Sequence, residues 1–136
     1  MPDRLPLDGV RVLDLSHVYA GPTCSRILCD LGAEVIKVEG IRRIDAVRGL
    51  FIADNDTRDD YWNRGLYFVC RNAGKRSLTL DFTSAWGGSA SGRNGEGVEL
   101  FKRLVPFADV VVESFTPRVM KNLGLDYDAL HQLRPD

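Results

Sequence analysis

The sequence predicts an α/β fold, a Rossmann-like open parallel sheet with flanking helices. Short runs rich in Val, Ile and Leu alternate along the chain with segments whose apolar residues recur every three or four positions. The runs carry apolar residues at consecutive positions, as strands do when helices cover both faces of a sheet. Glycine or proline marks most boundaries between the two kinds of segment, where turns are expected.

The chain begins with the clearest βαβ unit. Residues 10–15 form a strand-like run, a helix is predicted from about Pro22 to Leu31, and residues 34–39 form a second strand. Two parallel strands joined by a helix almost always cross over right-handed, so this unit sets the handedness of the sheet. Four apolar residues of the helix share one face by their spacing and are expected to lie on the sheet: Cys24, Ile27, Leu28 and Leu31.

The middle of the chain is less regular. Residues 40–64 show no sustained period and are predicted to form a long connection, which in a compact domain is usually functional. A short apolar run at 66–70 and a basic turn at 71–76 follow, and then residues 77–81 alternate as a strand does. Residues 83–95 are rich in glycine and small hydroxyl residues, and we expect them to form a flexible inserted loop.

The last part of the chain returns to the alternating pattern. A helix is predicted over 96–108 and a strand over 109–114, followed by a short helix that opens at Thr116-Pro117 and closes at Gly124. A final helix, capped by Asp126, is predicted to reach Leu133. An alternating α/β chain should continue with a strand after a helix, so the sequence predicts that these residues are a fragment.

Composition limits the classes of function. At 136 residues, with 44% hydrophobic and 27% charged residues, the chain has the size of one domain. Its net charge of −1 gives no reason to expect nucleic acid as a partner. A span of about 18 apolar residues and a signal-peptide pattern are both absent, so we expect no membrane association and a cytoplasmic location. The odd cysteine count shows no CxxC spacing, and Cys24 and Cys29 are predicted to be buried helix residues.

Three segments follow predicted strands and should meet at one edge of the sheet. They are residues 16–20, 80–83 and 114–116. In open parallel sheets ligands bind at the carboxyl ends of the strands, so a shared crevice is the natural hypothesis. Helix N-termini after Gly21 and Thr116 would attract an anion such as a phosphate, and aromatic residues there would suit a purine. The alternative is that polar residues stand there because the strands leave the core.

Single residues and short motifs are weaker evidence of function than the three segments taken together. His17 is a candidate ligand contact or general base, although a lone histidine is more often a hydrogen-bonded structural residue. The basic residues at 71–76 could hold a phosphate, but a solvated turn is the more common explanation. Glu39 occupies the place of the acid that binds ribose in dinucleotide folds, yet the GxGxxG fingerprint is absent. No GxSxG, HExxH or P-loop pattern is present, so no catalytic set or metal site is predicted.

With these segments placed, the chain resembles the N-terminal portion of the family III CoA-transferases. This is the CaiB/BaiF group, which includes formyl-CoA transferase and, on the same fold, acyl-CoA racemases. The motifs that carry the resemblance are LPLDGVRVLDLSHVYAGP at 5–22, LGAEVIKVE at 31–39, Asp45, Arg48-Gly49, Asn72, residues 75–78, ADVVVESFTP at 108–117 and LGLDYDAL at 123–130.

The resemblance implies a CoA-binding α/β domain, here residues 1–136, in a protein that moves CoA between an acyl-CoA and a carboxylic acid without a metal. It also implies a homodimer of interlocked subunits in the full-length protein. The positions implied to contact coenzyme A are His17, Tyr19, Ala20, Leu80, Asp81, Phe82, Ser114, Phe115 and Thr116. The family's nucleophile is an aspartate further along the chain, so the resemblance assigns no catalytic residue here, and these residues alone are expected to be inactive.

Several positions depart from the family pattern. Arginines common in the family are replaced by Gly40 and Asn122, and Arg42, Arg43 or Lys121 could supply the missing charge to CoA phosphates. Two further hypotheses stay open from the sequence. One is a fragment of an acyl-CoA racemase, and the other is a non-catalytic module that binds CoA or a nucleotide. A dinucleotide-dependent oxidoreductase is disfavoured because the glycine fingerprint is missing.

Overall fold

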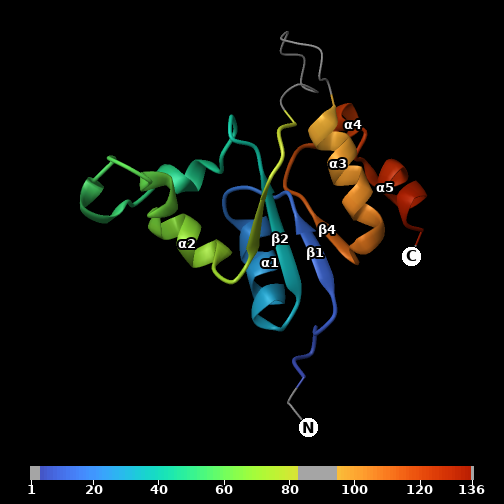
Figure 1. The fold of residues 1–136 in the computed structure, drawn as a ribbon, viewed down its shortest axis with the longest axis horizontal. Helices are drawn as coiled ribbons and strands as arrows, with labels where there is room; N and C mark the ends of the chain where they lie inside the picture. Colours follow the sequence, from blue (N-terminus) through green and yellow to red (C-terminus); the bar gives the residue numbers. More distant parts are fainter. Residues whose placement is uncertain (1–3, 83–94, 136) are drawn as a thin grey trace.

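The computed structural model describes residues 4–82 and 95–135, so the loop predicted at 83–95 lies, apart from Gly95, outside the described residues. Within these residues the chain forms a four-stranded, all-parallel sheet with the strand order β3-β2-β1-β4 and helices around it (Figure 1). The strands are β1 (Arg11–Asp14), β2 (Glu34–Glu39), β3 (Arg76–Thr79) and β4 (Val110–Val112). This architecture confirms the predicted α/β class.

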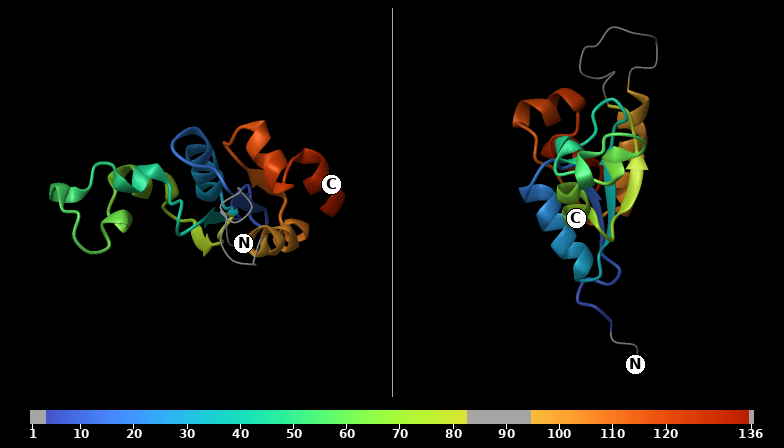
Figure 2. Two further views of the ribbon diagram at one scale, coloured as in Figure 1. Left: turned by 90° about the horizontal axis from the view of Figure 1, so that it is seen from above. Right: turned by 90° about the vertical axis from the view of Figure 1, so that its left-hand side faces the viewer.

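Helices occupy both faces of the sheet. Seen from the side and from above, α1 lies on one face and α3 on the other (Figure 2). The α-helices are α1 (Ala20–Asp30), α2 (Leu66–Asn72), α3 (Glu96–Leu104), α4 (Pro117–Leu123) and α5 (Tyr127–Leu133). Short 3-10 helices are η1 (Ala46–Gly49), η2 (Ala53–Asn55), η3 (Tyr61–Asn63) and η5 (Val105–Phe107).

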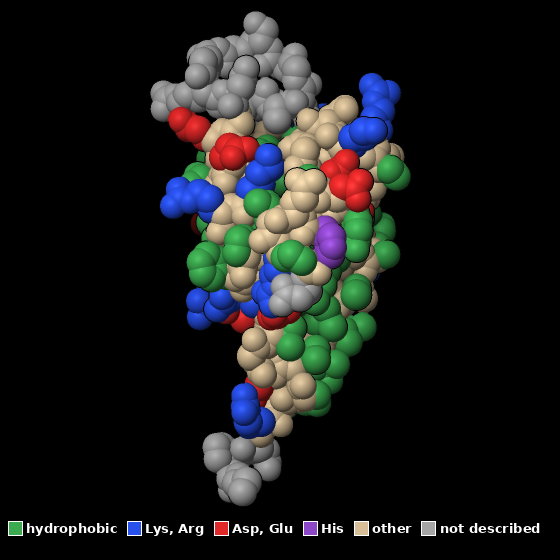
Figure 3. All heavy atoms as spheres, turned by 90° about the vertical axis from the view of Figure 1, so that its right-hand side faces the viewer, with side chains coloured by type: hydrophobic (Ala, Val, Ile, Leu, Met, Phe, Trp, Pro, Cys, Tyr) green, Lys and Arg blue, Asp and Glu red, His purple; other side chains and the backbone are tan. Residues whose placement is uncertain are grey.

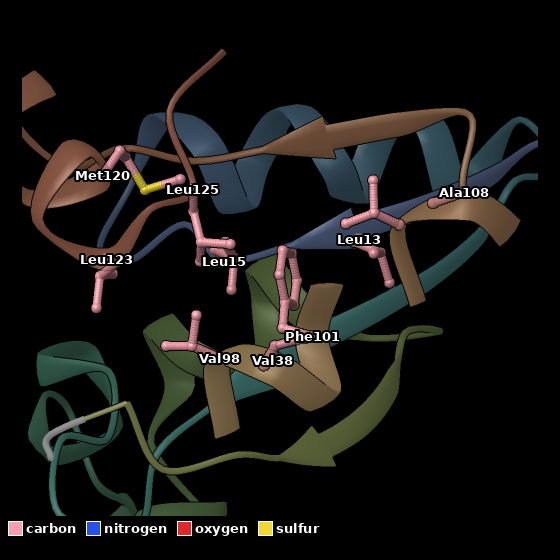
Figure 4. Packing of buried hydrophobic residues seen from close by; sticks show 10 residues of the cluster. Leu13, Leu15, Val38, Val98, Phe101, Ala108, Met120, Leu123 and Leu125 are labelled. Atoms are coloured by element: carbon pink, nitrogen blue, oxygen red, sulfur yellow. The ribbon is translucent and has the colours of Figure 1, made fainter. Parts of the chain in front are cut away.

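The larger core lies between the sheet and α3. Val98 and Phe101 of α3 point toward Leu13 and Leu15 of the β1 segment and toward Val38 of β2 (Figure 4). The apolar face predicted for the 96–108 helix is therefore confirmed, although the α-helix ends at Leu104 and continues as η5. A smaller apolar cluster of Val12, Ala33 and Val35 lies on the α1 face.

Helix α1 is rotated relative to the prediction. Cys24, Ile27 and Leu31 are exposed, with Ile27 55% exposed, whereas Gly21, Pro22 and Ser25 are buried. The prediction that Cys24 is buried and that Ile27 and Leu31 face the sheet is therefore wrong, whereas Leu28 and Cys29 are partly buried against the Val12 cluster. Small residues form the inner face because the helix packs very close: a Cβ on Gly21 would stand 2.3 Å from Cβ of Ser16.

The connection from β2 to β3 contains more structure than the sequence suggested. Its three 3-10 turns and α2 extend away from the sheet on one side (Figures 1 and 2). The apolar run at 66–70 and the first part of the predicted basic turn belong to α2. Arg48 ties this connection to β2, because its guanidinium binds the Glu39 carboxylate and lies over the ring of Phe68 at 3.4 Å.

The strands β3 and β4 form the two edges of the described sheet. Val110 is 38% exposed, so β4 is less buried than its apolar sequence predicted. On the side of the molecule that carries β4 and α5, hydrophobic side chains form a visible band (Figure 3). Helix α4 ends as predicted, because Gly124 follows it with φ +62°. Helix α5 begins as predicted, because the Asp126 carboxylate accepts from the Ala129 N–H at 3.3 Å.

Candidate functional site

A pocket of about 280 Å³ opens at the carboxyl edge of the sheet. The pocket lies at this edge because the four strands are parallel, and the segments that leave their carboxyl ends therefore converge there. Much of the wall is apolar, while His17, Glu39 and Arg43 contribute polar groups. The apolar lining includes Leu15, Val38, Leu80, Phe82, Phe115 and Leu123. A pocket with apolar walls and a few polar groups is the usual form of a small-molecule site.

The structure brings four of the nine predicted site residues into this pocket: His17, Leu80, Phe82 and Phe115. The rings of His17 and Phe115 pack with their centroids 5.4 Å apart and their planes at 59°. Two segments that are 98 residues apart in the chain are thus joined at the pocket wall. Contacts to coenzyme A stay a prediction for all nine positions.

The other five predicted residues lie around the pocket rather than in its wall. Ser114 bonds to the backbone of His17, and Thr116 occupies the position just before α4. Asp81 lies 3.7 Å from Arg42 in an exposed ion pair. Ala20 is the exposed first residue of α1.

Tyr19 faces a different group of residues. Its ring packs edge-on against the ring of Tyr67 in α2, with 5.7 Å between centroids. The guanidinium of Arg71 lies over the same tyrosine at 4.7 Å, which is within range of a cation–π interaction. Tyr19 therefore links the start of α1 to α2 in this structure.

The electrostatic surroundings of His17 keep its imidazole neutral. Burial is the main cause that lowers the pKa of His17, and the charge of Lys37 acts in the same direction. Nearby carboxylates oppose this effect but do not overcome it: Asp45, Glu39 and Asp14. At neutral pH the ring therefore has one N–H donor and one nitrogen acceptor to offer in the pocket.

A network of buried charges lies under the α1 face of the same edge, and sequence reasoning missed it. Asp14 and Lys37 stand opposite each other in the β1–β2 register. The Asp14 carboxylate accepts from Nζ of Lys75 at 2.9 Å and from Oγ of Ser25 at 2.7 Å. Burial alone would raise the pKa of Asp14, but the lysine charges and the hydrogen bonds outweigh it and hold that pKa below its ordinary value. The available signal was a charged residue in the middle of each apolar strand run.

Glu39 has a structural role in this network. Its carboxylate accepts from Arg48 through two contacts, Nη2 to Oε2 at 2.6 Å and Nε to Oε1 at 3.0 Å. It also accepts from the backbone N–H of Asp45 at 2.9 Å. Burial opposes ionisation, yet these partners keep the pKa of Glu39 below its ordinary value. The carboxylate is thus committed to protein donors, which speaks against the role of a ribose-binding acid.

The basic residues at 71–76 do not form a phosphate site. Lys75 points inward and its side chain is only 1% exposed. Arg71 lies over two tyrosine rings, and Arg76 is exposed and pairs with Glu34 at 3.0 Å. The three side chains diverge, so the hypothesis of a compact cluster for a phosphate is wrong.

The described ranges 4–82 and 95–135 show neither a metal-binding cluster nor a membrane-spanning helix. In them, no group of three or more His, Cys, Asp or Glu side chains is arranged to hold a metal ion. Over the same ranges, no helix has the length and apolar character required to cross a membrane.

The sequence of this chain is similar to those of known proteins. The sequence profile of CoA-transferase family III matches residues 7–136. An acyl-CoA transferase of Fusarium pseudograminearum is 41% identical over 134 residues, covering 95% of this chain and 26% of that protein. A succinyl-CoA–D-citramalate CoA-transferase of Chloroflexus aurantiacus is 40% identical over 130 residues, covering 96% of this chain and 28% of that protein.

Solved structures give the same result. A CAIB/BAIF family protein from Brucella suis is 38% identical with a TM-score of 0.74, over 96% of this chain and 31% of that one. The protein Rv3272 from Mycobacterium tuberculosis is 37% identical with a TM-score of 0.75, over 98% of this chain and 32% of that one. The chain thus spans between 26% and 32% of the length of these four proteins.

Proposed function

Because this chain belongs to CoA-transferase family III, we propose that the pocket at the carboxyl edge of its sheet binds coenzyme A or an acyl-CoA thioester. The observation that carries the proposal is the convergence of His17, Leu80, Phe82 and Phe115 in one pocket wall. An apolar wall with an aromatic ring suits the adenine of CoA, and the neutral His17 ring offers hydrogen bonds to it or to the ribose.

Arg43 is the cation that we propose for the CoA phosphates. Gly40 has no side chain to contribute, but a tight turn follows it, in which the Arg43 N–H donates to the Gly40 carbonyl at 3.1 Å. This turn brings Arg43 back beside Gly40 and into the pocket lining. A guanidinium there can make charge-assisted hydrogen bonds to a phosphate. Arg42, by contrast, does not line the pocket and lies within 3.7 Å of Asp81.

For the whole protein we propose the transfer of CoA from an acyl-CoA to a carboxylic acid. In this proposal, residues 1–136 form the CoA-binding domain and contribute no catalytic residue. Homodimer formation and a cytoplasmic location belong to the same proposal. Racemisation of an acyl-CoA would use the same pocket, and so would a non-catalytic role in CoA binding.

Titration of the chain with CoA by isothermal calorimetry tests the proposal, with NADH as the comparison ligand. We expect saturable binding of CoA and little heat from NADH, because the buried Glu39 is engaged by Arg48 rather than presented to a ribose. Absence of CoA binding would overturn the proposal. Preferential binding of NADH would favour a dinucleotide site instead.

A further inference from the structure

The backbone immediately after His17 has an unusual conformation. Val18 has φ +72°, in the left-handed region. A β-branched residue rarely adopts this region, because its side chain crowds the backbone there. Strained conformations of this kind persist only where surrounding contacts enforce them, and they cluster at functional sites. Val18 and His17 both line the pocket, so the strain lies at the proposed binding site.

The carboxylate of Asp45 is the contact that enforces this turn. It accepts from the Val18 N–H at 3.0 Å and 3.1 Å through its two oxygens, and the Asp45 side chain is fully buried. The same carboxylate also accepts from the Val47 N–H, which fixes Asp45 at the start of η1. The peptide group that follows His17 is thereby tied to the connection after β2.

The peptide group that precedes His17 is tied to the same pair. Nζ of Lys37 donates to the Ser16 carbonyl and lies 3.6 Å from an Asp45 carboxylate oxygen. The Lys37 side chain is only 2% exposed. A single buried ion pair thus contacts the backbone on both sides of one pocket residue.

Ser114, in the segment that follows β4, holds the backbone of His17 itself. Its hydroxyl accepts from the His17 N–H at 2.9 Å and donates to the His17 carbonyl at 3.2 Å. With both neighbouring peptide groups also held, the backbone of His17 has little freedom to rotate. The imidazole is left to pack against Phe115 at the pocket wall.

We propose that Lys37 and Asp45 are positioning residues, a buried ion pair that holds the backbone of residues 16–18 with Val18 in the left-handed region and so places the His17 imidazole in the CoA pocket. The role in binding rests on the proposed function, whereas the positioning of His17 does not require it. A purely structural role would predict loss of stability on mutation of Asp45 without any specific effect on His17.

A double-mutant cycle between Asp45→Ala and Val18→Gly separates the two roles. Glycine adopts positive φ without steric cost, so it should keep the turn when the carboxylate is absent. We expect Asp45→Ala to lower CoA affinity by roughly tenfold or more, the equivalent of one lost charge-assisted hydrogen bond. In the Val18→Gly background, Asp45→Ala should lower CoA affinity by less than about threefold. Glycine at position 18 keeps the positive φ without help from the carboxylate, so the two changes are coupled. An equal loss in both backgrounds would overturn the proposal.

Asp45→Asn keeps the cycle informative if the alanine variant does not fold. The amide retains an oxygen that can accept from Val18 N–H but loses the charge that faces Lys37. We expect its CoA affinity to lie between those of the wild type and Asp45→Ala, and to recover further with Val18→Gly. An affinity for Asp45→Asn equal to the wild type, and unaffected by Val18→Gly, would argue against the ion pair.

The His17 ring resonance in NMR spectra tests positioning without any ligand. Asp45→Ala should shift the His17 Cε1–Hε1 signal and Val18→Gly should move it back, even if the wild-type chain fails to bind CoA. Asp109→Asn is the control, since it weakens an ion pair with Arg134 at the amino end of β4, whereas His17 lies at the carboxyl ends of the strands. A His17 signal that stays in place in Asp45→Ala would overturn the positioning role, whereas absent CoA binding by the wild type would overturn only the proposed function.

Discussion

Nζ of Lys75 lies 2.9 Å from a carboxylate oxygen of Asp14, and the two side chains are 1% and 0% exposed. This pair joins the residue just before β3 to the middle of the sheet. Nζ also contacts the Pro22 carbonyl, Oγ of Ser25 and the Asn72 amide oxygen, so its donors are saturated. The lysine therefore links β1, α1 and α2 from a single buried position.

Removing one member of this pair should be costly. We expect Lys75→Met to lower the free energy of unfolding by about 3–5 kcal/mol, since it leaves the buried Asp14 carboxylate without the cation that is hydrogen-bonded to it. The double variant Asp14→Asn/Lys75→Met should lose much less free energy of unfolding than the sum of the two single variants, because neither charge of the pair remains. Urea denaturation measures both, and strictly additive losses would contradict the role of the pair.

Gly97 should resist substitution although it lies in a helix. A Cβ there would stand 2.3 Å from the backbone oxygen of Asp81, in the segment between two pocket residues. We expect Gly97→Ala to destabilise the fold by roughly 1–3 kcal/mol, since the steric cost exceeds the helical preference of alanine. Gly49→Ala is the matched control because its Cβ would meet no atom within 4 Å. Thermal unfolding compares the two, and equal stability of both variants would count against this close contact.

Stability should depend on the ionisation of His17. Its pKa in the folded state lies below the ordinary value of 6.5, so the folded protein takes up a proton less readily than the unfolded chain. The stability that arises from this difference in the pKa of His17 is fully present above about pH 6.5. It is lost as the pH falls from there toward the pKa of the folded state. Asp14 and Glu39 also have lowered pKa values, but they lose their contribution in a more acidic range, below 3.8 and 4.5 respectively.

Urea denaturation of the wild type and His17→Gln from pH 8 to pH 5 checks this dependence. The wild type should lose stability below about pH 6.5, and the glutamine variant should show a flatter profile over the same range. Parallel profiles would show that another group is responsible.

Arg48 should not be replaceable by lysine. Its guanidinium makes two contacts to Glu39 and lies over the Phe68 ring, and a lysine can match neither the paired geometry nor the planar stacking. We expect Arg48→Lys to lower the free energy of unfolding by about 1–3 kcal/mol. Arg58→Lys, in an exposed pair with Asp56, should change stability little. If denaturant melts show the two variants to be equally stable, the connection is held by other contacts.

The sequence predicted well what depends on regular patterns. The first βαβ unit, the apolar face of α3 and the meeting of distant strand ends at one edge follow from periodicity and from the parallel arrangement. That arrangement is why His17 and Phe115, far apart in the chain, could be expected together.

Features that depend on packing in three dimensions were not predictable. Helix α1 buries Gly21 and Ser25 rather than Ile27 because close approach to the sheet selects small residues, and apolar spacing carries no information about that distance. The strand charges at Asp14 and Lys37 are satisfied by partners from distant elements, such as Lys75, which no local pattern reveals. The run at 66–70 was too short for its periodicity to distinguish helix from strand.

The most direct test of the CoA pocket compares two adjacent arginines by calorimetric titration with CoA. Arg43 lines the pocket and Arg42 does not, and both are exposed, so neither alanine variant should disturb the fold. We predict that Arg43→Ala weakens CoA binding by roughly tenfold or more, as expected for a lost charge-assisted hydrogen bond, while Arg42→Ala stays within about threefold of the wild type. Equal affinities for all three proteins, or a larger loss for Arg42→Ala, would contradict CoA phosphate binding in this pocket.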